Sequence, residues 1–411
     1  MSAATSGAAT GQRHGSPLEV LRVFLRLGLT SFGGPVAHLG YFRGELVEKR
    51  RWLDEAAFAD IVALCQFLPG PASSQTGISL GLVRAGLPGA FAAWLGFTLP
   101  SAAAMILFGY GVTRFADLGH AAWLHGLKIV AVAVVANAVW GMARNLCPDR
   151  LRATIAIGAA VLALAMPSAA GQIGAIAAGA VIGWIVLRGG PAVREWAPLS
   201  IRLPRVLSVI AAILFIALLV GLPALAAAVP SHALALIAAF YRSGALVFGG
   251  GHVVLPLLQS SVVPPGWIDN NAFLAGYGAA QAVPGPLFTF SAYLGTVMRP
   301  GPDGWVGGLL CLAAIFLPSF LLLIAALPFW DALRRRTAVQ SGLRGVNAAV
   351  VGVLLAALYH PVWTSAILTP ADFAIGIAAF LLLALWAAPP WLVVALGAVT
   401  ATVVASLTGT G

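Results

Sequence analysis

The chain has 411 residues, of which 60% are hydrophobic and only 9% are charged. A soluble protein of this length surrounds its core with far more charge, so the composition excludes a soluble globular protein and indicates an integral membrane protein. The net charge of +10 does not indicate nucleic-acid binding, because Lys and Arg lie mostly in short loops between apolar runs rather than in one patch. The three cysteines lack the spacing of a metal site or a disulfide framework.

The N-terminal segment, 1–16, is rich in Ala, Ser, Thr and Gly and lacks the apolar stretch of a signal peptide, so we expect a disordered tail. The first structural unit is expected over 17–187. It opens with two apolar regions that are broken in the middle, 18–47 at Gly33-Gly34-Pro35 and 56–85 at Pro69-Gly70-Pro71. Apolar runs that could cross roughly 30 Å of hydrocarbon follow. They are 88–113, 121–143, 151–166 and 171–187.

A polar linker and one unpaired apolar run follow over 188–230, and the run at 206–228 predicts a bridging transmembrane helix. The second unit, 231–411, has the same order of elements as the first. Its broken regions are 234–263 and 272–298, and its unbroken apolar runs are 304–329, 342–359, 372–388 and 390–408.

The two units are copies of one another at an offset near 215 residues. Gln66-Phe67-Leu68-Pro69-Gly70-Pro71 returns as Gln281-Ala282-Val283-Pro284-Gly285-Pro286, and Phe32-Gly33-Gly34 returns as Phe248-Gly249-Gly250. The Leu-Pro-Ser motif at 99–101 returns at 317–319. A collinear series of this kind indicates an internal repeat rather than a coincidental richness in Gly and Pro.

Loop charges indicate that the two repeats are inverted. Loop 43–51 is rich in Lys and Arg while its counterpart 259–271 has none, and 334–336 is all Arg while 114–120 has a single Arg. By the positive-inside rule, matching loops then face opposite sides of the membrane. We therefore predict an all-α integral membrane protein of two inverted repeats joined by a bridging transmembrane helix. Each repeat has re-entrant or broken helices plus about four spanning helices.

The repeated Pro-Gly-Pro breaks predict half-helices that begin inside the membrane. The N-terminus of a half-helix presents free N–H groups and about half a positive charge, and transporters with inverted repeats use such ends to bind anions. The alternative is that the prolines only kink two spanning helices. The candidate binding residues at the breaks are Gly33, Gly34, Gln66, Pro69, Gly70, Pro71, Ser73, Ser74 and Gln75 in the first unit, and Gly249, Gly250, Gln281, Pro284, Gly285, Pro286 and Thr289 in the second.

Ionisable residues inside the apolar segments add further candidates. All 13 Asp and Glu are expected in loops or at segment ends, whereas Arg26, Lys128 and Arg242 lie within apolar segments. Burying one charge costs about 2.5–3.5 kcal/mol, so we expect these cations to face an anionic cargo, with snorkelling to the membrane surface as the alternative. His38 and His252 follow the Gly-rich breaks and are candidates too, with a structural role as the alternative.

Taken together, the Phe-Gly-Gly breaks at 32–34 and 248–250 and the two Gln-x-x-Pro-Gly-Pro segments resemble the chromate transporter (CHR) superfamily, in its long form with two repeats. The resemblance covers nearly the whole chain. It implies chromate efflux that confers resistance, by a multi-pass protein of a bacterial inner membrane, with sulfate as a chemically similar ligand. Shorter members of the superfamily resemble one half and work in pairs, and a homodimer of this chain is left open.

The predicted function is therefore secondary transport of chromate out of the cytoplasm. Transport of sulfate or another oxyanion by the same fold, and an anion channel, are the alternatives. The sequence has no nucleotide-binding loop, dinucleotide-binding turn or cluster of metal ligands, so we expect no enzyme activity and no cofactor. The expected partners are chromate or sulfate and the lipid bilayer, and not nucleic acid.

Overall fold

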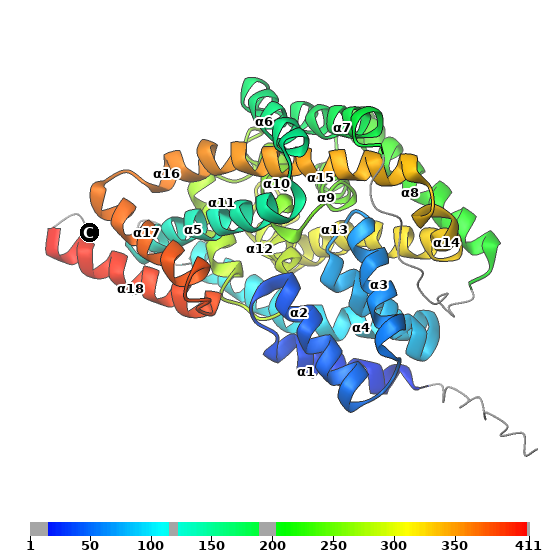
Figure 1. Cartoon of the computed structure of the whole chain (residues 1–411). Coiled ribbons are helices and arrows are strands. Elements are labelled where there is room, and N and C mark those ends of the chain that lie inside the picture. Colours follow the sequence, from blue (N-terminus) through cyan, green and yellow to red (C-terminus); the bar gives the residue numbers. More distant parts are fainter. Residues whose placement is uncertain (1–14, 115–121, 189–202, 409–411) are drawn as a thin grey trace, which may run out of the picture.

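Figure 1 shows the computed structural model of the chain, which describes residues 15–114, 122–188 and 203–408. The predicted tail 1–16, the linker 188–205 and the loop 114–120 fall largely outside these residues. Helices and their connections make up the described residues, with no β-strand among them. The all-α class is thus confirmed.

The first unit contains the helices in the order that the sequence predicts. Its broken regions form α1 with α2 and η1, and α3 with the start of α4. The backbone of α4 leaves helical geometry at Ala85 and Gly86, so its first segment (72–84) and its second segment (87–114) are separate rods. The bounds are α1 (Pro17–Thr30), α2 (Gly34–Phe42), η1 (Arg43–Lys49), α3 (Glu55–Phe67), α4 (Ala72–Arg114), α5 (Ala122–Leu146), α6 (Arg150–Ala165) and α7 (Ala169–Val186).

The bridging helix and the second unit follow the same plan. Here the counterparts of the two segments of α4 are separate helices, α12 and α13. The bounds are α8 (Arg205–Ala228), α9 (His232–Ala245), η3 (Gly251–Val253), α10 (Val254–Val262), α11 (Asn270–Ala280), η4 (Leu287–Thr289), α12 (Phe290–Val297), α13 (Gly304–Ala326), η5 (Leu327–Phe329), α14 (Trp330–Arg334), α15 (Thr337–Ala357), η6 (Leu358–Trp363), α16 (Thr364–Ala366), α17 (Pro370–Ala384) and α18 (Pro390–Thr408).

Each broken region of the first unit is a hairpin that returns to the end where it began. Ser16, before α1, and Arg50, after η1, line one small pocket, so the ends of the first hairpin lie together. The second hairpin ends at Arg84, which pairs with Glu19 of α1 (NH2–Oε1 3.0 Å). The Arg84 guanidinium also lies 5.2 Å from the ring of Trp52, just before α3. All four hairpin ends therefore gather at one end of the unit.

The second unit repeats this arrangement around Trp267, the counterpart of Trp52. The ring of His232, at the start of α9, lies 4.7 Å from the Trp267 ring. The N–H of Arg299, which follows α12, donates to the carbonyl oxygen of Trp267 (3.0 Å). Both hairpins of the second unit therefore also begin and end together.

Helix lengths separate two classes among the predicted crossings. Seven helices of the described residues are long and apolar enough to span a membrane, beginning at residues 72, 122, 169, 205, 304, 337 and 390. The predicted crossings 151–166 and 372–388 form the shorter helices α6 and α17, of 16 and 15 residues. At 1.5 Å per residue these cover about 24 Å or less, so they cross the membrane where the bilayer is locally thinned.

The two units are interlocked, because long helices of one pack against the closing helices of the other. α15 packs on α6 and α7, and α5 packs on α17 and α18. Small residues allow the backbones to meet, as membrane helix packing favours. A Cβ added to Gly345 of α15 would collide with the backbone of Gly179 and Gly183 of α7. Gly126 of α5 meets the backbone of Gly397 of α18 in the same way.

The second segment of α4 and its repeat equivalent α13 run in opposite directions. Near its C-terminus, α4 meets the start of α13, where the Trp305 N–H donates to the Tyr110 hydroxyl (3.0 Å). Nearer the start of its second segment, α4 meets the C-terminal part of α13, where the rings of Trp94 and Phe320 lie 5.8 Å apart. Both helices carry the repeated Leu-Pro-Ser motif, so this antiparallel pair joins the same part of each repeat.

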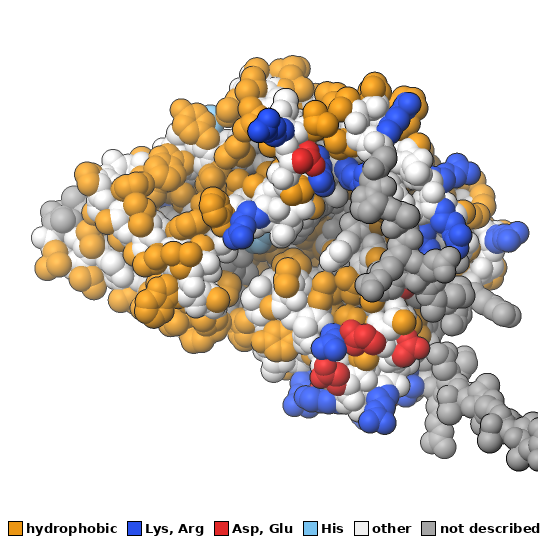
Figure 2. Space-filling view, in the orientation of Figure 1, with side chains coloured by type: hydrophobic (Ala, Val, Ile, Leu, Met, Phe, Trp, Pro, Cys, Tyr) orange, Lys and Arg blue, Asp and Glu red, His pale blue; other side chains and the backbone are white. Residues whose placement is uncertain are grey.

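Figure 2 shows a surface that is largely hydrophobic, with Lys and Arg over the middle, right and lower parts of the view. The left end, where α16, α17 and α18 lie in Figure 1, shows none on this face. Among the seven long apolar helices, the bridging helix α8 has the highest mean hydropathy, 2.8, and only 11% of its most apolar 18-residue stretch is buried. A helix that is apolar on all sides and is not covered by protein is suited to contact with the acyl chains of the lipids.

Candidate functional site

The helix breaks of the two units are joined by two equivalent hydrogen bonds. The N–H of Gly70, in the second break of the first unit, donates to the carbonyl oxygen of Val247, in the first break of the second unit (2.6 Å). The N–H of Gly285 donates in the same way to the carbonyl oxygen of Ser31 (2.9 Å). The repeat makes Gly70 equivalent to Gly285 and Ser31 equivalent to Val247, so each unit gives the other the same contact. These two N–H groups are already paired within the protein.

A serine of the opposite unit occupies the space beside each of these glycines. A Cβ on Gly70 would lie 3.0 Å from Ser319 Oγ, and a Cβ on Gly285 would lie 2.8 Å from Ser101 Oγ. Their φ angles of +127° and +99° also favour glycine over any L-residue with a side chain. The sequence predicts an approaching anion at these glycines, and the structure places a neighbouring hydroxyl there.

A cavity of about 120 Å³ lies between the first break of the first unit and the second break of the second unit. One water needs about 10–15 Å³ of such volume, so there is room for an ion of five heavy atoms. Asn137 of α5, His252 and Gln281 supply polar side chains. We call this the central cavity; its lining is Gly33, Gly34, Pro35, Val134, Asn137, Ala138, His252, Ala280, Gln281, Val283, Gly285, Leu287, Leu383 and Pro390.

The central cavity contains a polar atom that lacks a protein partner. Nε2 of Gln281 is buried and makes no hydrogen bond to the described part of the chain, whereas Nδ1 of His252 lies 2.7 Å from the Tyr277 hydroxyl. Gln66, the repeat equivalent of Gln281, is exposed instead. Asn137 was not predicted, because a single Asn in an unbroken apolar run resembles a helix-packing residue; its polarity in the middle of that run was the available signal.

The predicted residues Ser73, Ser74 and Gln75 form the first turn of α4 and are buried. Ser73 Oγ lies 3.3 Å from Nδ1 of His38, which brings another predicted residue to this turn. The Gln75 side chain donates from Nε2 to the carbonyl oxygen of Pro69 (2.7 Å). The amide therefore bridges the Pro-Gly-Pro break and holds the start of the half-helix in place.

The matching start of the half-helix in the second unit is built differently. The Thr289 hydroxyl donates to the carbonyl oxygen of Pro286 (2.9 Å), so it caps the backbone. A Cβ on Gly249 would lie 3.2 Å from Met142 of α5, and one on Gly250 would lie 3.8 Å from the Met142 sulfur. The Gly-rich break of the second unit thus faces an apolar side chain of the first.

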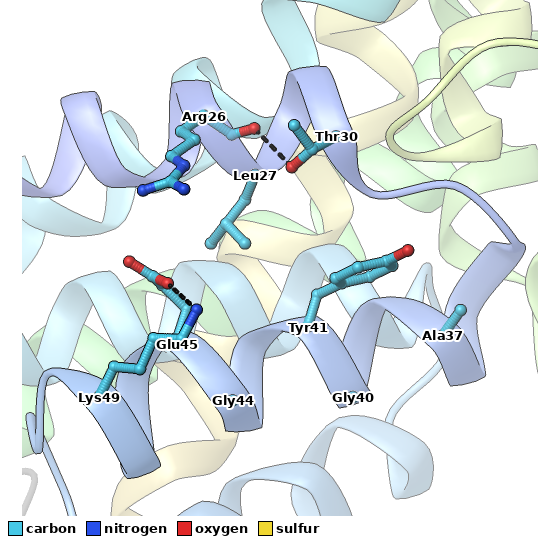
Figure 3. A pocket seen from close by; sticks show the side chains of 9 residues that line it. All are labelled: Arg26, Leu27, Thr30, Ala37, Gly40, Tyr41, Gly44, Glu45 and Lys49. Carbon is cyan, nitrogen blue, oxygen red and sulfur yellow. Dashed lines mark hydrogen bonds and ion pairs between the residues drawn. The ribbon is translucent and has the colours of Figure 1, made fainter.

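Arg26 and Arg242 do not reach the central cavity. Arg26 is exposed and, with Glu45 and Lys49, lines a groove of about 480 Å³ between the arms of the first hairpin (Figure 3). Arg242 donates to Ser261 Oγ of α10 (3.2 Å), across the arms of the equivalent hairpin. Both arginines occupy the same place in their repeats, between the two arms of a hairpin.

Lys128 lies in a separate, larger cavity of about 860 Å³, which we call the α5 vestibule. Its Nζ donates to Asn271 Oδ1 (3.1 Å). In the same cavity His125 Nε2 lies 2.9 Å from Asp372 Oδ1, which joins α5 to α17. The vestibule and the central cavity both border α5 and α17, but the vestibule lies at the start of these helices and the central cavity lies farther along them.

The prediction that all carboxylates lie in loops or at segment ends is wrong for Asp60. This residue lies in the middle of α3 and is fully buried. Its Oδ1 accepts hydrogen bonds from Arg334 NH1 (2.8 Å) and Trp330 Nε1 (3.1 Å) of α14. The charge is tolerated inside an apolar region because a cation from the other unit, distant in sequence, neutralises it.

The profile of the chromate transporter family matches residues 18–184 and 234–402, which are the two repeats that enclose the cavity. The chain belongs to the chromate transporter family. It is thus a member of a family of membrane transporters and not of an enzyme family, and the apolar helices agree with a multi-pass membrane protein.

Individual relatives in the family match over most of the chain. It is 29% identical to a chromate transport protein of Pseudomonas aeruginosa, over 80% of this chain and 77% of the relative. It is 28% identical to a probable chromate transport protein of Synechococcus elongatus, over 83% of each, and 27% identical to a chromate transport protein of Cupriavidus metallidurans, over 85% and 84%. No solved structure matches the chain.

Proposed function

We propose that the chain is a secondary transporter that exports chromate, a tetrahedral oxyanion, from the cytoplasm across a bacterial inner membrane. The observation that carries this proposal is the central cavity, which helix breaks from both repeats line. A site shared between two equivalent units opens to one side or the other when the units rock against each other, which is what alternating access requires. Family membership supports chromate as the cargo.

The anion is bound in this cavity by neutral donors. The side-chain amides of Gln281 and Asn137 supply N–H groups, and half-helix ends add partial positive charge. No Lys or Arg of the described residues lines the cavity. A site without a fixed cation suits transport, because the ion must leave as readily as it enters.

In this proposal the repeats are inverted and the broken regions are re-entrant. The antiparallel pairing of α4 and α13 supports the inversion, since equivalent helices that point in opposite directions require equivalent loops on opposite sides. The ends of the hairpins lie together, at Trp52 in one unit and at Trp267 in the other. This supports the interpretation that the broken regions enter the membrane and return to the same side. The cation-rich loop 43–51 is then cytoplasmic.

The two ends of the molecule differ in how tightly the units are joined, as expected for one state of an alternating-access cycle. At the end we assign to the cytoplasm, the buried Asp60–Arg334 pair holds the two units together. At the opposite end lies the α5 vestibule, a cavity that Lys128 and His125 help to line. We infer a conformation that is closed toward the cytoplasm and hollowed toward the periplasm.

Export needs no nucleotide in this scheme. With a negative cell interior, moving two negative charges outward releases about 4.6 kcal/mol per 100 mV. Sulfate has the same tetrahedral shape and charge, so it is the cargo most easily confused with chromate. A channel differs from a transporter in that its flux does not saturate.

Uptake into inverted membrane vesicles tests the proposal. Radiolabelled chromate should accumulate with saturable kinetics, faster with an interior-positive potential, and excess sulfate should compete if it shares the site. Vesicles from cells with an empty vector give the background. Flux that rises linearly with chromate concentration would indicate a channel, and uptake no greater than the background would contradict the proposal.

A further inference from the structure

The start of α4 in the first unit is surrounded by buried polar atoms that have no partner in the described residues. These atoms belong to side chains that are at most 3% exposed. A buried hydroxyl or imidazole nitrogen without a hydrogen bond costs free energy, and native proteins keep few of them without a reason. The atoms are Ser31 Oγ, His38 Nε2, Ser74 Oγ and Thr98 Oγ1.

Contacts of His38 and of neighbouring residues place these residues near the start of α4. Ser74 lies in the first turn of α4, and the neighbouring Ser73 Oγ lies 3.3 Å from the other nitrogen of His38. The His38 ring meets the Phe97 ring edge-on at 5.2 Å, one residue before Thr98. Ser31 belongs to the break before α2, and its carbonyl oxygen accepts from Gly285, which lines the central cavity. The polar cluster therefore adjoins that cavity.

In the second unit, the equivalent positions hold mostly apolar side chains. The equivalents of Ser31 and His38 are Val247 and Val254, both fully buried. The equivalents of Ser73 and Thr98 are Phe288 and Phe316, whose rings lie 5.6 Å apart. The equivalent of Ser74 is Thr289, whose hydroxyl is used on the carbonyl oxygen of Pro286. One repeat fills this place with apolar side chains, and the other keeps it polar with hydroxyls that lack partners.

We propose that the start of α4 is an occluded binding position for a tetrahedral oxyanion, present in the first unit alone. This inference rests on the proposed function and adds a second, occluded position for the anion beside the central cavity, with the residues that form it. The hydroxyls of Ser74 and Thr98, Nε2–H of His38 and the first N–H groups of α4 donate to the anion oxygens. Gln75 adds an unpartnered acceptor, Oε1, for a water or a protonated oxygen that travels with the anion.

The test uses purified full-length protein with Ser74→Ala and Thr98→Val, which remove one hydroxyl each at nearly constant volume. The dissociation constants of chromate and sulfate are measured by calorimetry, together with the unfolding temperature with and without the anion. We expect each variant to bind chromate about tenfold more weakly or worse, because each loses a hydrogen bond to a charged ligand. Without the anion its unfolding temperature should be unchanged or higher, since an unpaired polar group has been removed.

Thr296→Val is the matched control, because the buried Thr296 hydroxyl donates within its own helix to the carbonyl oxygen of Ala292 (2.7 Å). It should bind chromate like the parent protein. If Ser74→Ala and Thr98→Val also bind chromate like the parent while the parent transports chromate, the inference is wrong and the proposed function stands. A lower unfolding temperature of Ser74→Ala without anion, at unchanged affinity, shows a structural hydroxyl and overturns the inference too. If the parent neither binds nor transports chromate or sulfate, the proposed function itself fails.

Discussion

Asp60 of the first unit and Arg334 of the second form an ion pair with side chains that are 0% and 7% exposed. The same carboxylate oxygen accepts from Trp330, so two side chains of α14 hold α3. Removing one member of a buried pair leaves the other charge without compensation, which costs more than the pair contributes as a whole.

We therefore expect Asp60→Ala to lower the free energy of unfolding by about 3–5 kcal/mol, because Arg334 stays buried. Chemical unfolding in detergent, followed by tryptophan fluorescence, measures the loss. Glu19→Ala is the control, since the Glu19–Arg84 pair is partly exposed at 30% and 22% and such pairs contribute about 1 kcal/mol or less. An equal loss for both variants would show that burial does not distinguish the pairs.

Gly70→Ala and Gly285→Ala should impair transport to a similar degree. Each Cβ would press on a serine of the opposite unit, and each residue has a φ that L side chains adopt at a cost of about 1–2 kcal/mol. Gly158→Ala in α6 meets nothing within 4 Å and should transport like the parent. Transport rates are compared at equal abundance in the membrane. Full activity of both motif variants would mean that the two reciprocal contacts can be broken without consequence.

Gln281→Glu should abolish chromate transport, whereas Gln66→Glu should reduce it far less. The first change puts a carboxylate into the central cavity, where it repels a dianion, and the second puts the same charge at the exposed repeat equivalent. We expect at least a tenfold difference between the two initial rates, because like charges at close range in a poorly hydrated site repel strongly. Equal rates would place the anion path away from Gln281.

The inverted topology predicts opposite labelling of matching loops. In a background without Cys65, Cys147 and Cys311, single cysteines at exposed positions of 43–51 and at 335–336 should react with a membrane-impermeant maleimide only after the cells are opened. Cysteines at 259–271 should react in intact cells. Finding 43–51 and 259–271 on the same side of the membrane would rule out the inversion.

Much of the architecture could be predicted from sequence, because Pro and Gly interrupt helices by local geometry. The predicted breaks at 33–35 and 69–71 overlap the breaks of the structure, at 31–33 and 68–71, and so do their copies in the second unit. The partners of those breaks could not be predicted. Gly70 bonds to Val247 through a packing of the two units that no local pattern encodes.

The structure does not bring all the predicted site residues to one place. Charge inside an apolar segment pointed to Arg26, but helix periodicity turns this residue to the exposed face, away from buried Phe24 and Leu27. Asp60 lies near the start of its apolar segment and therefore resembles a segment-end carboxylate. The sequence does not reveal its neutralising partner Arg334, which lies 274 residues away. A single sequence does not report such pairs, since each partner alone looks like an ordinary charged residue.

The interlocked packing has a consequence for how the chain is made. The ribosome finishes α7 at Val186, but α15, against which α6 and α7 pack, begins only at Thr337. At about 5–20 residues per second, those helices wait roughly 8–30 s in the bilayer with the small-residue face around Gly179 and Gly183 uncovered. During that interval the nascent first unit is open to association with other newly inserted helices. Slowing synthesis between the units should therefore increase its capture by membrane quality-control proteases.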